Sequence, residues 1–462
     1  RFRNVTGVQT CALPISGIDF NNRRIKPMTT SVTIRPPENN AILDREWLRN
    51  LGRSCGADAI GFTEATRQEL GADRETIMDI LPGAKSVAAI LIRLNQDAIG
   101  SSWMSIANCE MSNMTKRLDS AAAELSRKLN EFGMRSVAIP IAFPMEAHKW
   151  PEKMWAVSHK TIAVQAGLGS IGHNRLLIHP EFGAGVLLST VIFDRPVNTY
   201  DTPLAKSPCN GCKLCVAACP TGSIRPDGRF NFINCSTHNY RYRLGGFIDW
   251  VETIAQSRSA REYREQIPDK ETIATWQALT YQTEYTCLNC IAICPVGRPA
   301  AVSGKESDKE PGSRSLLRKL QSRGETVFVL KGSDAEAHVR KNFPEKTIRQ
   351  VSSKTRIKNP GAFIAALPLV FQPEQSEGLN AVFHFQFTGK ASAQGTVTIS
   401  NKHLSISHKL EGTPDIQVSG DGNVWLACTA GERSLLWALL TRKMRIQGKI
   451  GLLQHFARCF PK

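Results

Sequence analysis

Eight cysteines between residues 206 and 300 are the side chains of this sequence with the clearest capacity for chemistry. Seven of them stand in two runs, C-x2-C-x2-C-x3-C and C-x2-C-x3-C, each followed directly by a proline, and the eighth stands alone between the runs. The eight are Cys209, Cys212, Cys215, Cys219, Cys235, Cys287, Cys290 and Cys294. Three thiolates at the first spacing bind one iron–sulfur cube, and the fourth cysteine of such a run binds a second cube. The spacing therefore predicts two 4Fe–4S clusters.

This crossing of ligands between cubes also predicts which cysteines share a cluster. The first cluster takes three cysteines of the first run and the last of the second run: Cys209, Cys212, Cys215 and Cys294. The other cluster takes Cys219, Cys235, Cys287 and Cys290. Paired cubes carry single electrons at low potential, so they act as a wire with a reaction site at one end.

Zinc and disulfides are the competing uses of these cysteines. A zinc site needs four ligands and would leave part of the run unused. Disulfides need an oxidising compartment, and the N-terminus lacks the apolar segment of a secretory signal. The remaining cysteines considered have no metal spacing, and we expect small core or surface residues at Cys55, Cys109, Cys428 and Cys459.

A glycine-rich stretch precedes the cysteines. In AGLGSIGHN, residues 166–174, Gly167, Gly169 and Gly172 have the G-x-G-x-x-G spacing, and Asp194 follows about twenty residues later, as in a dinucleotide fingerprint. That fingerprint requires a preceding strand, whereas KTIAVQ before the loop has helical character. Three uses of the loop stay open: NAD binding, a purely structural tight turn, and the close approach of a flat macrocycle to backbone without side chains.

Residues 41–205 have the pattern of a mixed α/β domain. A helix is predicted over 44–56 with Asp44 as its N-cap, and another over 115–133 that ends at Gly133. Apolar runs at 85–92 and 136–143 are predicted strands. Helices alternating with buried strands predict a layered sheet core that positions the glycine loop.

Two further parts follow the cysteines. Residues 301–315 have the polar composition of a linker, and 325–340 form a small βα unit whose helix is capped at Ser333 or Asp334. A separate domain begins near Pro360, with a strand in which Phe383, Phe385 and Phe387 alternate with polar residues. A hairpin over 396–407 and two amphipathic helices around 432–443 and 449–460 complete it.

Composition bounds the class of protein. The chain has 462 residues with 42% apolar and 21% charged residues, which is typical of a soluble protein of two or three domains. No stretch has the roughly 18 uninterrupted apolar residues of a membrane span. Of the net charge of +17, +12 falls at or after Pro311, which would suit RNA, an anionic membrane surface or a solvated basic face. Residues 1–16 resemble a translated sequencing adapter and are left out of the fold. We expect a cytoplasmic protein.

The stretch 159–194, with its glycine loop and the following LLIHPEFG, stands before a double-cluster segment and resembles epoxyqueuosine reductase and the corrinoid reductive dehalogenases. The resemblance covers about 41–350. It implies a nitroreductase-like α/β domain that binds cobalamin with its lower base detached, followed by a ferredoxin-like domain at 206–300. The residues that would bind the corrinoid are Gly167, Gly169, Gly172, His173 and Asn174.

The chain departs from that family where a proton donor is expected. The family carries an aspartate in a Val-Asp-Ser/Thr stretch before the helix that leads to the loop, whereas WPEKMWAVSHK has none. Glu152 and His159 are the candidate catalytic acids, with Lys153 as a third titratable group. Each of these is equally compatible with an ordinary surface position. His173 replaces the family's lysine, so the substrate is not inherited.

Residues 360–462 resemble a sterol carrier protein type 2 domain, from the order of strands, helix, the short strand RIQGK and a final helix. The resemblance implies an apolar tunnel for a lipid or another hydrophobic molecule. Epoxyqueuosine reductases carry helical repeats here that help to hold tRNA, so RNA is not the favoured partner.

Together these features predict an α+β multidomain protein with nitroreductase-like, ferredoxin-like and sterol-carrier-like parts. The predicted activity is that of an oxidoreductase that receives electrons from an unidentified donor and passes them through two 4Fe–4S clusters. A cobalamin-type cofactor would then reduce an unidentified, hydrophobic substrate. The first alternative is a dicluster electron-transfer protein with a lipid-binding module and no catalysis of its own, and the second is epoxyqueuosine reduction in tRNA.

Overall fold

The computed structural model describes residues 42–150, 153–282, 285–298, 311–352, 357, 359–389 and 392–461. Residues 1–16 and the candidate acid Glu152 lie outside this part of the chain. Within it, no helix is both long enough and apolar enough to cross a bilayer.

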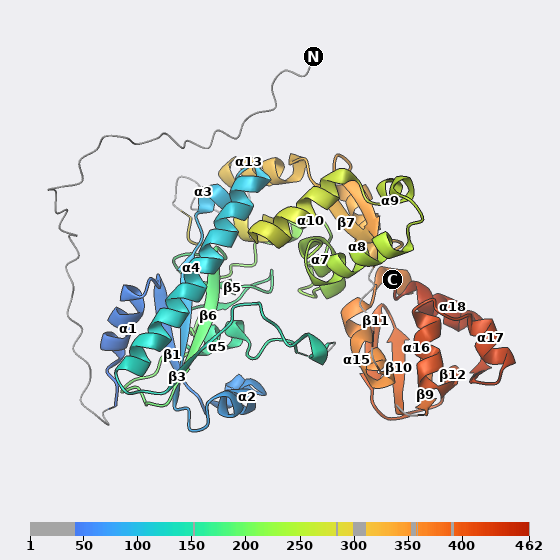
Figure 1. Cartoon of the computed structure of the whole chain (residues 1–462), viewed down its shortest axis with the longest axis horizontal. Helices are drawn as coiled ribbons and strands as arrows, with labels where there is room; N and C mark the ends of the chain where they lie inside the picture. Colours follow the sequence, from blue (N-terminus) through green and yellow to red (C-terminus); the bar gives the residue numbers. More distant parts are fainter. Residues whose placement is uncertain are drawn as a thin grey trace, which may run out of the picture. The chain divides into compact units, whose positions relative to one another are not determined.

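A four-stranded antiparallel sheet forms the core of the first part, in the order β1-β2-β6-β3. Its strands are β1 (Ala59–Glu64), β2 (Ser86–Arg93), β3 (Ser136–Ile139) and β6 (Val186–Phe193). The sheet packs against α1 (Arg45–Ser54), α4 (Met104–Glu131) and α5 (His159–Gln165), and Figure 1 shows α1 and α4 beside it. Smaller elements complete this part: α2 (Asp73–Ile80), α3 (Gln96–Ile99), β4 (Ser170–Ile171), β5 (Leu177–Ile178) and the 3-10 turns at Gln68–Leu70 and Ala147–Lys149.

The strand and helix predictions for this part are confirmed, with corrected ends. The Asp44 side chain caps α1 by accepting a hydrogen bond from the Trp47 amide at 2.7 Å. The helix predicted over 115–133 begins earlier, at Met104, because Ala107 and Asn108 are also buried on its inner face. The strand predicted over 136–143 stops at Ile139, since Pro140 has no N–H to continue the ladder.

The cysteine-bearing part is mainly helical. It contains α6 (Leu214–Ala218), α7 (Phe232–Asn239), α8 (Leu244–Gln256), α9 (Ala260–Gln266), α10 (Asp269–Tyr281) and α11 (Asn289–Ala292). The linker prediction fails over 311–315, which open the helix α13 (Pro311–Ser322), while 301–310 lie outside the described residues. A proline can begin a helix because the first amide needs no partner within it.

The predicted βα unit is confirmed and extended. β7 (Thr326–Leu330) leads into α14 (Asp334–Asn342), and the Ser333 side chain accepts from the Glu336 amide as its N-cap. The sequence analysis missed β8 (Thr347–Val351), which pairs in parallel with β7. Only one residue of β8 is buried, so it lacks the apolar run that marks a strand.

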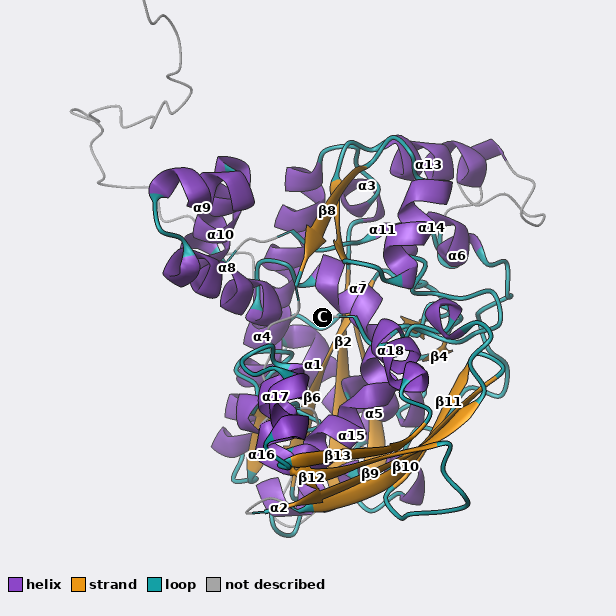
Figure 2. Cartoon of the chain, turned by 90° about the vertical axis from the view of Figure 1, so that its right-hand side faces the viewer, coloured by secondary structure: helices purple, strands orange, loops and turns teal. Residues whose placement is uncertain are grey.

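The C-terminal module is a five-stranded sheet in the order β11-β10-β9-β12-β13. Figure 2 shows these strands side by side, with α15 and α16 packed against them. The elements are α15 (Pro360–Val370), a 3-10 turn at Glu374–Ser376, β9 (Ala381–Thr388), β10 (Ala393–Ser400), β11 (His403–Ser407), β12 (Ile416–Asp421), α16 (Gly422–Thr429), α17 (Leu435–Leu440), β13 (Met444–Gly448) and α18 (Gly451–Arg458). The hairpin prediction is confirmed, with its turn at Asn401 and Lys402, both at positive φ. The three alternating phenylalanines of β9 are buried in the core of this module. The mixed α/β multidomain class is thus confirmed.

Candidate functional site

Two segments far apart in the sequence bring the predicted cysteine ligands together. The first run lies in a loop that enters α6, and the second lies around α11, which contacts α6 directly. Gly211 and Lys213 both have positive φ, so the chain turns sharply between successive cysteines of the first run. The eighth cysteine, Cys235, comes from α7. Among the described residues, none of the twelve cysteines forms a disulfide.

The interactions between these thiols divide them into two groups. Burial raises the pKa of Cys215 to about 12, and the thiols that add to this shift are Cys212, Cys209 and Cys294. Burial likewise raises the pKa of Cys290 well above its usual range, with contributions from Cys287, Cys235, Cys219 and Cys215. Apart from the interaction between Cys215 and Cys290, these neighbours match the two ligand sets predicted from the spacing. We call them the Cys215 group (Cys209, Cys212, Cys215 and Cys294) and the Cys235 group (Cys219, Cys235, Cys287 and Cys290).

The donor set fits iron–sulfur clusters chemically. Burial of several thiols together disfavours their thiolate forms, because each negative charge would lie in a poorly solvated site beside others. A cluster compensates that charge, and metal binding then releases the protons. Within the described residues, no three His, Cys, Asp or Glu side chains converge as ligands of one metal ion would. A cube binds each thiolate through a different iron, so its ligands stand further apart than those of one ion.

An apolar shell surrounds the Cys215 group. Cys212 and Cys215 pack against a cluster of buried residues from α3, α4, α6, α11 and α13. Its members are Leu94, Ile99, Ala107, Leu214, Ala218, Leu288, Ala292, Ile293 and Leu320. Such a shell limits water at the sulfurs, which is one of the factors that set the reduction potential of a cluster.

The glycine loop lies against protein in this structure. It forms the hairpin of β4 and β5 and follows a helix, so the strand required by a dinucleotide fingerprint is absent from this position. A Cβ added at Gly167, which has φ of +70°, would lie 2.7 Å from the Thr202 carbonyl oxygen. At Gly169 and Gly172 the added atom would meet Ile178. The three missing side chains therefore make room for the chain itself, as in a structural tight turn.

The end of the same loop contacts the cysteine segments. His173 donates from Nε2 to the Arg225 carbonyl at 2.9 Å, and buried Asn174 donates to the Cys290 carbonyl at 3.4 Å. Further along, Gly183 approaches the backbone of Val296 so closely that a side chain would not fit. The loop thus positions the second cysteine run against the first part of the chain. The sequence analysis did not foresee this role.

The structure describes two of the titratable candidates, His159 and Lys153. His159 is partly buried, its Nδ1 lies 2.8 Å from the Thr190 hydroxyl, and its Nε2 lies 3.0 Å from the Pro140 carbonyl oxygen. Burial lowers the pKa of this imidazole, so its neutral form is favoured, with Nε2 donating to the carbonyl. Lys153 forms an ion pair with Asp73. A proton-donor role for His159 stays a prediction, and both of its ring nitrogens are already engaged.

A cavity of about 140 Å³ opens beside the Cys235 group. Its walls come from the 142–155 loop, from α7 on both sides of Cys235, and from the start of α8. The walls are largely apolar and aromatic, formed by Phe143, Met145, Trp150, Met154, Trp155, Phe232, Ile233 and Tyr240 among others. We call this cavity the aromatic pocket.

Two of the residues that line the aromatic pocket carry polar groups. The indole N–H of Trp150 is buried and has no hydrogen-bond partner among the described residues. The Arg243 guanidinium lies 4.9 Å from the ring centre of Phe143 and 5.9 Å from that of Tyr240. A buried donor without a partner costs free energy.

The aromatic pocket is small for the corrinoid that the resemblance implied. Pockets for drug-sized ligands measure about 300–1,000 Å³, and a corrin ring is at least as large as such ligands. The three loop glycines, which would have formed a cradle, face Thr202 and Ile178 instead. In the described residues, these positions do not fit a corrinoid.

A buried charge network, which the sequence analysis missed, stands close to the Cys235 group. Lys346 Nζ lies 2.6 Å from Glu325 Oε1, and Arg323 lies 3.5 Å from the other carboxylate oxygen. Tyr285 donates its hydroxyl to Glu325 at 2.6 Å and lies 3.1 Å from Nε2 of His238. Burial lowers the pKa of His238 to about 4. The only signal in the sequence would have been charged residues within apolar surroundings.

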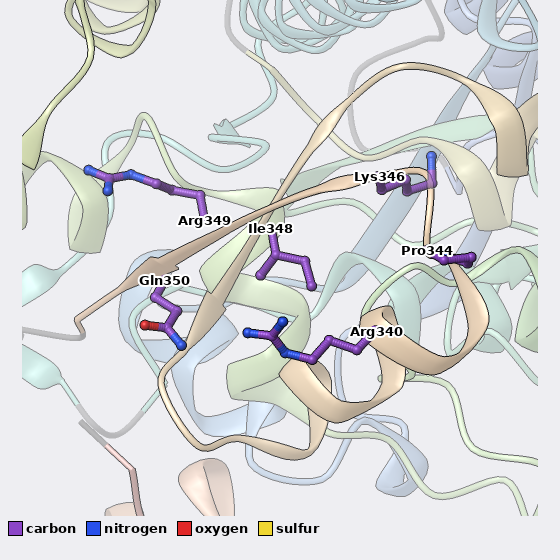
Figure 3. Close-up of a pocket in the computed structure, with 6 residues that line it drawn as sticks. All are labelled: Arg340, Pro344, Lys346, Ile348, Arg349 and Gln350. Carbon is purple, nitrogen blue, oxygen red and sulfur yellow. The ribbon is translucent and has the colours of Figure 1, made fainter.

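A second, open cavity lies on β8 and α14, and Figure 3 shows its lining. Three cations border it, but each already has an acidic partner: Arg340 pairs with Glu336, Arg349 with Glu271, and Lys346 with Glu325. In Figure 3 the side chains of Arg349 on β8 and of Lys346 just before that strand point in different directions. The cavity therefore lacks the converging free donors of an anion site.

Known proteins are similar to separate parts of the chain. An epoxyqueuosine reductase of Listeria monocytogenes is 32% identical over 142 residues, which are 31% of this chain and 30% of that protein. One from Pseudomonas aeruginosa is 26% identical over 239 residues, 51% of this chain and 53% of that protein. Part of the chain is similar to epoxyqueuosine reductases. The matched stretches span between about a third and about a half of these relatives.

The C-terminal module and the solved structures complete the comparison. Residues 370–461 match the model of the SCP-2 sterol transfer family, which confirms the predicted resemblance of this module. An epoxyqueuosine reductase solved with a modified tRNA-Tyr stem loop aligns with 21% identity and a TM-score of 0.36, covering 58% of this chain and 68% of that one. A catabolic reductive dehalogenase aligns with 16% identity and a TM-score of 0.36, covering 64% and 35%.

Proposed function

We propose that this protein is an iron–sulfur oxidoreductase that passes single electrons through two 4Fe–4S clusters to an acceptor in the aromatic pocket. The observation that carries the proposal is the gathering of eight thiols into two neighbouring groups, one of which takes Cys235 from a helix that lines the pocket. The similarity of part of the chain to epoxyqueuosine reductases supports the same chemistry.

The two groups differ in exposure, which gives the electron path a direction. Asn210, Gly211 and Lys213 around the Cys215 group are exposed, so an external electron donor can approach there. An electrostatic interaction between Cys215 and Cys290 links the groups, and Cys235 lies on a helix that lines the pocket. Each cluster carries one electron. A two-electron reduction in the pocket would therefore need two successive electron transfers, with protons supplied by groups other than the clusters.

The chain's own residues would bind and orient the acceptor. The aromatic walls exclude water and hold an apolar or aromatic molecule, while Trp150 donates to an acceptor atom and Arg243 favours partial negative charge. Lys160 interacts with the Cys235 thiol and is a polar group near this end of the path. The low-potential clusters and the free cysteines suit a reducing compartment such as the cytoplasm.

The test is metal analysis of protein purified without oxygen, followed by reduction. About eight irons and eight sulfides per chain are expected, with signals of reduced cubes in electron paramagnetic resonance. Thr237→Trp places an indole in the pocket wall and should keep the iron while slowing electron transfer to aromatic acceptors, whereas Thr237→Ser should leave it unchanged. Zinc in place of iron, or equal transfer in both variants, would overturn the proposal.

Cobalamin and tRNA are the finer alternatives, and each has its own test. Cobalamin added to cluster-loaded protein should not give the absorption spectrum of bound cobalamin. Atoms of the chain itself fill the space beside the loop glycines, and the aromatic pocket is too small for a corrin ring. The similarity of part of the chain to epoxyqueuosine reductases favours epoxyqueuosine reduction. Restoration of queuosine in a strain that lacks the enzyme would assign that substrate. If clusters form but no acceptor is turned over, the chain is an electron-transfer protein with a lipid-binding module.

A further inference from the structure

The short helix α17 exposes two leucines on one face. Leu436 is 66% exposed and Leu440 is 76% exposed, and residues four apart lie on the same side of a helix. The opposite side holds Ala438, which is fully buried in the core of the C-terminal module. Isolated exposed apolar residues are common on protein surfaces. Two adjacent ones therefore need a second feature before they indicate a partner.

That second feature is an excess of positive over negative charge in and after the helix. From Arg433 to the end of the chain there are seven Lys and Arg residues and no Asp or Glu. Arg433 and Lys443 lie 4.7 Å and 5.1 Å from the ring centre of Trp437, which stands next to Leu436 in the helix. Arg442 is exposed in the turn that ends α17.

We propose that this face of α17 docks on an anionic lipid bilayer. The α17 surface consists of Arg433, Leu436, Trp437, Leu440, Arg442 and Lys443. Leucine side chains gain free energy on entering the boundary between headgroups and acyl chains, and tryptophan is favoured at that depth. Cations around them attract anionic headgroups within a Debye length. Each residue type on the α17 surface would thus contribute to membrane binding.

Other occupants explain fewer of these residues. A stable protein interface buries about 800 Å² on each partner, which is more than one six-residue helix offers. RNA would use the cations and could stack on Trp437, but it gives no reason for exposed Leu436 and Leu440. The absence of acidic residues after Glu432 fits a partner whose charge is uniformly negative over a wide area. The lipid surface is therefore the occupant that accounts for the whole set.

The experiment measures sedimentation of the full chain with vesicles. Binding is expected to vesicles of phosphatidylcholine mixed with phosphatidylserine, to weaken as salt is raised, and to be weak with phosphatidylcholine alone. Arg442→Gln with Lys443→Gln should weaken binding roughly 25-fold, from about fivefold per cation. Leu436→Ser with Leu440→Ser should weaken it at least about tenfold, since the apolar contribution is lost.

Matched variants elsewhere on the surface serve as controls. Ile273 and Leu279 on α10 are 52% and 59% exposed, so Ile273→Ser with Leu279→Ser removes a similar apolar area. Arg318→Gln with Lys319→Gln on α13 removes two exposed cations. These controls should bind vesicles as the parent does. Near-ultraviolet circular dichroism checks that every variant is folded, and a variant that unfolds is replaced by Leu440→Gln alone.

Three results would overturn the proposal. The first is equal binding to neutral and anionic vesicles, and the second is an equal loss of binding in the control variants. The third is retention of vesicle binding by the α17 variants together with loss of binding to a short RNA, which would assign RNA to the surface. None of these depends on clusters in the same chain, so the proposed redox function is tested separately.

Discussion

The assignment of Cys294 to the Cys215 group can be tested by removing cysteines in pairs. Cys294 is only four residues from Cys290 in sequence, yet its interactions are with Cys209 and Cys212 of the other run. If a cluster cannot form when one of its four ligands is missing, each single variant loses one cube. Iron should fall from about eight to about four per chain in Cys290→Ala and equally in Cys294→Ala.

The double variants separate the possible pairings. Cys215→Ala with Cys294→Ala removes two ligands of the same group, so about four irons should remain. Cys290→Ala with Cys294→Ala removes one ligand from each group, so iron should fall close to zero. If ligands were instead shared by neighbours in sequence, the two results would be exchanged. That outcome would refute the grouping inferred from the structure.

The assay needs anaerobic protein, iron and sulfide analysis, and electron paramagnetic resonance of the reduced state. Cys109→Ala is the control, because Cys109 is exposed on α4 and belongs to neither group. Its iron content should equal that of the parent chain. The two single variants should also differ spectroscopically, since each retains a cube with a different protein environment.

Three further predictions concern stability and are measured by urea unfolding. The pKa of His238 is lowered to about 4 by burial, against 6.5 ordinarily, so between these values only the unfolded chain binds the proton. Stability should therefore fall as pH decreases from about 6.5 to about 4, by up to about 3 kcal/mol, and His238→Gln should lose this slope. Lys346→Met removes the nearer of the two cations that pair with the buried Glu325 carboxylate and should cost up to about 3–5 kcal/mol, while exposed Lys341→Met should cost almost nothing. Gly167→Ala adds a clash with a backbone carbonyl to a positive-φ conformation, whereas Gly133→Ala, at φ of +78° with open space around it, incurs only about 1–2 kcal/mol from the backbone. Equal losses at the two glycines would contradict the packing described for the loop.

Local signals in the sequence were sufficient for several elements of the fold. The N-caps at Asp44 and Ser333 depend on a side chain and an amide three residues away, so they can be read from a short stretch. The Asn401–Lys402 turn is equally local. The cysteine spacing also encodes a partition between two groups, because the geometry of a cube restricts which cysteines of a run can bind it.

The features that sequence analysis missed are assembled from distant parts. The aromatic pocket takes residues from Ala142 to Ser352, and no short window of the sequence contains more than a part of its wall. The Glu325 network joins Tyr285, His238 and Lys346, each of which is unremarkable where it stands in the chain. Prediction of either would have required knowing which helices meet.

The glycine loop shows that a motif can have the expected spacing without identifying the group that its glycines approach. Glycine permits close approach of any group, and the spacing alone does not tell whether that group is a phosphate, a macrocycle or the same chain. Here Ile178 and Thr202 occupy the space, and Asn174 at the end of the loop contacts the Cys290 carbonyl. A rigid hairpin pressed against the second cysteine run fixes that run relative to the first. Under the proposed function, the glycines would therefore serve electron transfer indirectly, by holding the Cys235 group beside the aromatic pocket.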